Sequence, residues 1–126
     1  MRAVDTNVLV RLIARDEPAQ VAAAERFVES GAWVSHITLV EATWVLDSVY
    51  DLRPGAIATA VEMLLNNEQL TVQDAETVRA AVALLRAQPA LGFSDCLILE
   101  GARKAGHTPL GTFDRALGRV AGAVCI

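Results

Sequence analysis

Apolar and polar positions along the chain fall into blocks of two lengths. Short apolar runs have the length and composition of buried strands. They alternate with longer stretches that are typical of helices. The strand-like runs are 2–4, 32–35, 69–72, 108–110 and 123–126. The helical stretches are 7–15, 19–29, 37–51, 55–66, 75–88 and 95–105.

Several of these stretches carry start or stop signals at their ends. Pro18 opens the second helix, Pro54 precedes the fourth, Asp74 can cap the fifth and Gly106 can close the sixth. Strands and helices that alternate at this length predict an α/β fold with a parallel sheet and helices on both faces. No repeat, low-complexity tract or linker interrupts the pattern, so we expect a single domain over residues 1–126.

Composition supports this class of fold. The hydrophobic fraction is 53%, aromatic residues are few, and 126 residues suffice for one core. No apolar run approaches the ~20 residues that span a bilayer, and Asp5 and Arg11 interrupt the stretch where a secretory signal would lie. We therefore expect a cytoplasmic protein without a membrane segment. Cys96 and Cys125 are too few for a disulfide framework, and we expect free thiols.

Four acidic residues are placed where such a fold would bring them together. Asp5 follows the first predicted strand, Asp114 follows the fourth, and Glu41 and Asp95 lie on helices. In open parallel sheets the functional crevice lies beyond the carboxyl ends of the strands. Carboxylates that converge there repel one another unless a cation neutralises them. A divalent-metal site is therefore the leading interpretation.

The spacing around Glu41 predicts that its side chain points inward. At about 100° per residue, Thr43 and Asp47 belong to a polar stripe that we expect to face solvent. Glu41 points away from that stripe, and Ile37 and Trp44 flank it at helical spacing. A buried glutamate needs a cation or a partner. The alternatives without a metal are a buried ion pair or a glutamate that reaches solvent at the helix edge.

Helix capping is an alternative explanation for the other three acids. Asp95 stands beside Ile98 and Leu99 on one helix face, but it also lies at a helix start, where capping alone explains an aspartate. Asp5 can cap the helix that follows it, and Asp114 can begin a turn. Each acid is weak evidence alone, whereas four acids at comparable places are harder to attribute to capping.

Charge leaves nucleic-acid binding open. The net charge of −4 argues against binding through phosphate contacts. The objection weakens when four of the acids hold metal ions, which present positive charge to a phosphate. Arg11 with Arg15, and Arg115 with Arg119, are like-charge pairs four positions apart, which indicates exposed helical surface.

Four segments together resemble a known family. They are residues 4–10 (VDTNVLV), residues 39–50 with Leu39-Val40-Glu41, Trp44 and Tyr50, residues 93–98 (FSDCLI) and residues 112–114 (TFD). In order and spacing the chain resembles the PIN domain, more narrowly the VapC-type toxins. The resemblance implies a three-layer α/β/α fold with a five-stranded parallel sheet and an acidic pocket at the strand carboxyl ends. It also implies Mg²⁺- or Mn²⁺-dependent ribonuclease activity, held inactive by a VapB-type antitoxin.

Carried over residue by residue, the acidic quartet is Asp5, Glu41, Asp95 and Asp114, and the supporting polar residues are Asn7 and Thr112. Oxygen ligands suit Mg²⁺ and Mn²⁺, and a bound ion would activate water for attack on an RNA phosphodiester. We expect Asp5 and Asp95 to be the central ligands, with Glu41 and Asp114 completing one or two metal sites.

The expected partners are an RNA substrate, the antitoxin and a second copy of the chain in a homodimer. The alternative is a catalytically silent PIN-shaped module that binds RNA or protein. A dehalogenase-type phosphatase would need a second aspartate where Asn7 stands, and a phosphoacceptor receiver domain would need paired acids near the first strand.

Overall fold

Short parallel strands alternate with helices in the computed structural model, which describes residues 1–126. The strands are β1 (Arg2–Ala3), β2 (Ala32–Val34), β3 (Leu70–Val72), β4 (Leu110–Thr112) and β5 (Ala123–Cys125). The helices are α1 (Thr6–Ala14), α2 (Pro18–Val28), α3 (His36–Ser48), α4 (Pro54–Asn66), α5 (Ala75–Ala87), α6 (Phe93–Ala105) and α7 (Arg115–Gly118), and the 3₁₀ helix η1 (Pro89–Leu91) precedes α6. The predicted α/β class is confirmed, and α7 and η1 add to the predicted helices.

The helix boundaries follow from local chemistry. Pro18 and Pro54 occupy the first positions of α2 and α4, where the missing N–H leaves no bond unmade. Asp74 caps α5 by accepting a hydrogen bond from the backbone N–H of Thr77 at 3.4 Å. Gly106 ends α6 in the left-handed conformation, at φ 83°. These four predictions are confirmed.

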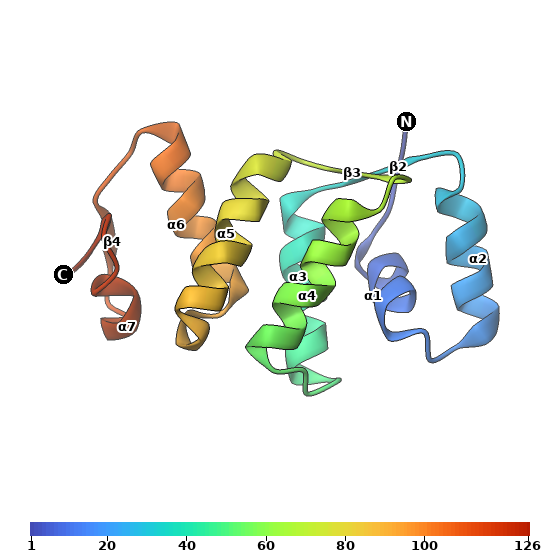
Figure 1. Cartoon of the computed structure of the whole chain (residues 1–126), viewed down its shortest axis with the longest axis horizontal. Coiled ribbons are helices and arrows are strands. Elements are labelled where there is room, and N and C mark those ends of the chain that lie inside the picture. Colours follow the sequence, from blue (N-terminus) through green and yellow to red (C-terminus); the bar gives the residue numbers. More distant parts are fainter.

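The strands form two separate parallel sheets. One contains β1, β2 and β3 in that order, and the other contains β4 and β5. Figure 1 shows the two sheets apart, with the helices in a row between the α2 end and the β4–α7 end of the molecule. The expected single five-stranded sheet is therefore not found, because β1 pairs only with β2 and β4 pairs only with β5.

Strand length and chain connectivity explain this division. β1 has two residues, both exposed, so it offers few hydrogen bonds and no buried side chain to a further strand. β5 follows β4 through the short α7, and closing so small a loop costs little entropy. β4 also begins later than predicted. Pro109 has no N–H to donate, and the first bond comes from Leu110 N–H to Gly122 O at 2.8 Å.

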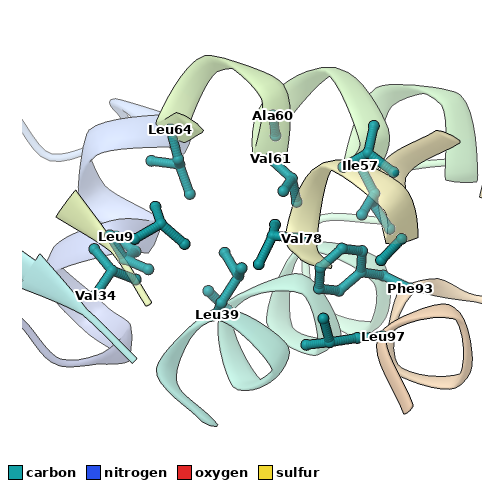
Figure 2. Close-up of a cluster of buried hydrophobic side chains, with 14 of the residues drawn as sticks. Leu9, Val34, Leu39, Ile57, Ala60, Val61, Leu64, Val78, Phe93 and Leu97 are labelled. Atoms are coloured by element: carbon teal, nitrogen blue, oxygen red, sulfur yellow. The ribbon is translucent and has the colours of Figure 1, made fainter. Parts of the chain in front are cut away.

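Side chains from helices and strands form one hydrophobic cluster of 26 buried residues. Figure 2 shows part of it, where Leu9 of α1 and Val34 of β2 lie at one side and Phe93 and Leu97 of α6 at the other, with Leu39 of α3 between them. This packing holds α3, which carries Glu41, between α1, which Asp5 precedes, and α6, which carries Asp95. None of the helices has the length and apolar character required to cross a membrane.

Candidate active site

The four predicted acids lie in two groups. In the first group, Asp5 directly precedes α1 and its neighbour Thr6 contacts Glu41 of α3. The Thr6 hydroxyl Oγ1 donates a hydrogen bond to Glu41 Oε2 at 2.9 Å. The structure therefore joins two chain segments that are distant in sequence and that each carry a predicted acid.

The second group consists of Asp95 and Asp114. Burial raises the pKa of the Asp95 carboxyl above its ordinary value, and the negative charge of Asp114 raises it further. Asp95 lies in the first turn of α6, where the helix dipole favours an anion. Burial and repulsion outweigh that effect, so the ionised form of Asp95 is disfavoured in this arrangement.

A cleft of about 290 Å³ lies between Glu41 of α3 and the start of α6, the helix that carries Asp95. Glu41 and Trp44 line it from α3, and Phe93 and Ser94 line it from the start of α6. Asp95 is the next residue on α6. The cleft thus has a carboxylate on one wall and the N-terminal turn of α6 on the other.

Capping accounts for two of the acids and not for the other two. Asp5 accepts a hydrogen bond from Val8 N–H at 3.3 Å, and Asp114 accepts one from Leu117 N–H at 3.0 Å, so both are N-caps. Asp95 is not a cap, because the N-cap of α6 is Gly92 and no side chain caps this helix. Capping is therefore wrong as the explanation for Asp95, whereas its place in the first turn of α6 still favours a carboxylate through the helix dipole. The Asp95 carboxylate has no hydrogen-bond or ionic partner.

The prediction that Glu41 lies on the buried side of its helix is also wrong. Glu41 is exposed, as are Ile37 (74%) and Trp44 (67%), whereas Thr43 is 5% exposed. α3 has apolar residues on all of its faces, so the packing of the neighbouring helices decides which face is buried. Thr43 tolerates burial because its hydroxyl donates to Val40 O at 2.8 Å. The apolar side chains beside Glu41 consequently form surface rather than core.

The two supporting residues have different positions. Thr112 Oγ1 accepts a hydrogen bond from the backbone N–H of Asp114 at 3.0 Å, so it does fix the turn that carries an acid. Asn7 is exposed on α1 and borders a different cleft, between α1 and α2. Thr6 is the contact that sequence reasoning missed. Its only signal was a hydroxyl directly after Asp5, which capping explained equally well.

The acids suit a hard divalent cation by chemistry but are not gathered around one point. All four offer carboxylate oxygens, which Mg²⁺ and Mn²⁺ prefer. No three histidine, cysteine, aspartate or glutamate side chains lie close enough together to hold a metal ion. Cys96 beside Asp95 is buried, and this burial is the main reason that the pKa of its thiol is raised to about 11. Cys96 is therefore a packed side chain and not a thiolate ligand.

Comparison with known proteins identifies the family. Parallel strands, intervening helices and acids near the strand ends define an α/β protein with carboxylate chemistry. Residues 2–123 match the family described as the PIN domain, and the chain belongs to that family. PIN domains are generally nucleases. A search of curated proteins and a search of solved structures found no match.

Proposed function

We propose that this PIN domain is a Mg²⁺- or Mn²⁺-dependent endoribonuclease, and that it is the toxin of a VapBC-type pair acting in the cytoplasm. The observation that carries the proposal is the position of Asp95. Its carboxylate is partly buried, lacks a partner and lies near Asp114. Two carboxylates held in this way are unfavourable for stability alone, and a cation between them removes the penalty.

The free strand edges suggest how the two acidic groups would form one site. β1 pairs with β2 along one edge, and its other edge is unpaired. In the same way, β4 pairs with β5 along one edge and has its other edge unpaired. Parallel pairing of these edges would give a five-stranded sheet in the order β3-β2-β1-β4-β5, the central layer of the three-layer fold that the family resemblance implies. Asp5 and Asp114 follow the two joining strands, so their carboxylates would meet in an acidic pocket at the carboxyl ends.

In that pocket the four carboxylates would have distinct tasks. Asp5 and Asp95 would be the central ligands, with Glu41 and Asp114 completing the coordination. Thr6 would orient Glu41, and Thr112 would hold the Asp114 turn. A bound Mg²⁺ or Mn²⁺ supplies an activated water and neutralises charge on the scissile phosphate. The cleft beside Glu41 would admit the RNA strand.

The surface around the acids fits a protein partner as well. Ile37, Trp44 and Phe113 are 74%, 67% and 82% exposed, and Glu41 and Asp114 lie beside them. Apolar side chains mixed with carboxylates suit an antitoxin segment that carries apolar and cationic residues. In the same proposal, a homodimer would cover further apolar surface. The second candidate function is a catalytically silent binding module, which the separation of the acids into two groups favours.

RNA cleavage tests the proposal. The purified protein with Mg²⁺ or Mn²⁺ should cut RNA, and Glu41→Gln should lower the rate by roughly tenfold to 100-fold, because it removes a charge that fixes the ion. Asp47→Asn is the matched control, since Asp47 lines the same cleft from the same helix. Wild-type protein that never cleaves RNA would favour the binding module. Equal cleavage by Glu41→Gln and Asp47→Asn would show that Glu41 does not belong to the metal site.

A further inference from the structure

Arg11 lies at the centre of a polar network that joins three parts of the chain. Its guanidinium donates to Asp16 Oδ1 at 2.6 Å, to Glu17 Oε2 at 3.2 Å and to the Tyr50 hydroxyl at 3.2 Å. The Tyr50 hydroxyl donates in turn to Asp16 Oδ2 at 2.7 Å. α1, the turn before α2 and the segment after α3 are thereby connected.

Arg11 is not the exposed surface cation that its spacing from Arg15 predicted. Its side chain is 17% exposed, whereas that of Arg15 is 55% exposed and pairs with Glu25 at 3.4 Å. The hydrogen bond from Tyr50 lowers the pKa of Asp16, and the charge of Arg11 lowers it further. Asp16 is therefore ionised at neutral pH and neutralises Arg11. A cation enclosed in this way is not available to RNA phosphates.

The position of the network gives it a second role besides holding the fold. α1 and α3 pack against each other, and the Thr6–Glu41 hydrogen bond joins them at the start of α1. The Arg11–Tyr50 hydrogen bond joins α1 to the end of α3, ~7.5 Å further along α1 at 1.5 Å per residue. Buried side chains such as Leu9 and Leu39 hold α1 against α3, and non-directional apolar packing is less specific about orientation than hydrogen bonds are. The two polar links, one near each end of α1, therefore refine how α1 is placed on α3.

We propose that Arg11, Asp16 and Tyr50 form a positioning network that sets the place of α1 on α3 and so holds Asp5 and Glu41 in register for one metal ion. Ligands need to be held within about 0.5 Å for this purpose. The inference rests on the proposed metal-dependent function. It makes Tyr50, which follows the helix that carries Glu41, a determinant of metal affinity without metal contact.

Tyr50→Phe is the test variant because it removes one hydroxyl and keeps the ring. The matched control is Thr59→Val, which removes the hydroxyl that accepts from Arg86 at 3.3 Å between α4 and α5. Mn²⁺ affinity of the full-length, metal-free chain is measured by calorimetry, and amide shifts by NMR. Tyr50→Phe should weaken Mn²⁺ binding about tenfold and shift the Asp5, Thr6 and Glu41 amides. Thr59→Val should leave affinity and these amides unchanged.

These two measurements, together with the melting temperatures of both variants, separate the possible failures. Wild-type protein that binds no Mn²⁺ would overturn the proposed function and this inference with it. Wild-type binding that Tyr50→Phe leaves intact would overturn the inference alone, and so would unshifted Asp5 and Thr6 amides. Equal loss of melting temperature in both variants without a change in affinity would show that the network only stabilises the fold.

Discussion

The hydroxyl of Thr6 donates a hydrogen bond of 2.9 Å to the carboxylate of Glu41 and so joins the first turn of α1 to the exposed side of α3. Glu41 has no buried environment to hold it, so this bond is what restricts its side chain. The neighbour of Thr6 is Asp5, and the contact therefore sets the spacing between two predicted metal ligands.

Replacing Thr6 should affect metal binding more than folding. Thr6→Val removes the donor and keeps the shape, and we expect metal affinity to fall by about tenfold. The bond is exposed, so the free energy of unfolding should change by less than about 1 kcal/mol. Thr6→Ser keeps the hydroxyl and should behave as wild type. Calorimetry and urea unfolding measure the two quantities, and a Thr6→Val protein with wild-type affinity would contradict this role.

Asp95→Asn should stabilise the metal-free protein at pH 7. Because the folded-state pKa of Asp95 is raised, the ionised carboxylate opposes folding at pH 7, and this penalty disappears as pH falls below that pKa. Asparagine removes the charge at every pH. We expect a melting temperature higher by roughly 2 °C at pH 7, a small shift because the group is only partly buried and solvent screens its charge.

Circular dichroism with EDTA at pH 7 and pH 3 measures this difference. The two proteins should have similar melting temperatures at pH 3, where Asp95 is protonated. A variant that is less stable than wild type at pH 7 would mean that Asp95 has a stabilising partner.

The ion pair between α5 and α6 should make the fold sensitive to acid. The pKa of Asp74 is lowered to about 2. The hydrogen bond from Lys104 is the largest cause, and the hydrogen bond from the Thr77 hydroxyl is the next. A carboxyl with a lowered folded-state pKa contributes stability that is full above its unfolded pKa of about 3.9 and is lost as pH falls towards 2. Asp74→Asn keeps a capping side chain but loses the charge.

Urea unfolding at pH 7, 4 and 2.5 tests this prediction. Wild type should be more stable than Asp74→Asn at pH 7, the gap should be nearly as large at pH 4, and it should narrow clearly at pH 2.5. A gap that stays constant from pH 7 to pH 2.5 would show that the charge of Asp74 contributes nothing.

Local signals in the sequence predicted local structure well. Pro18, Pro54, Asp74 and Gly106 mark helix ends because each acts on its own backbone or on residues within one turn. The boundary of β4 was misplaced because the apolar run includes Pro109, which cannot pair. The division into two sheets depends on which strand edges pair. β1 has only two residues and both are exposed, so its sequence does not indicate which strand pairs with its free edge.

The candidate site was only partly predictable for a related reason. Periodicity gives the angle between Glu41 and Thr43 on α3 correctly, but it does not say which face meets the neighbouring helices. With apolar residues all round the helix, the packing of α1, α4 and α6 made the Thr43 face the buried one. Asp95 shows the reverse case. Its place at a helix start suggested a cap, and only the structure shows that its carboxylate has no such partner.

Mn²⁺ titration of three proteins tests whether both acidic groups belong to one metal site. Asp5→Asn and Asp114→Asn each remove one charge, one from each group. Both keep an N-cap, because asparagine caps as well as aspartate. Each variant alone should weaken Mn²⁺ binding at least tenfold relative to wild type. If Asp5→Asn abolished binding while Asp114→Asn bound Mn²⁺ as wild type does, the two acidic groups would not form one metal site.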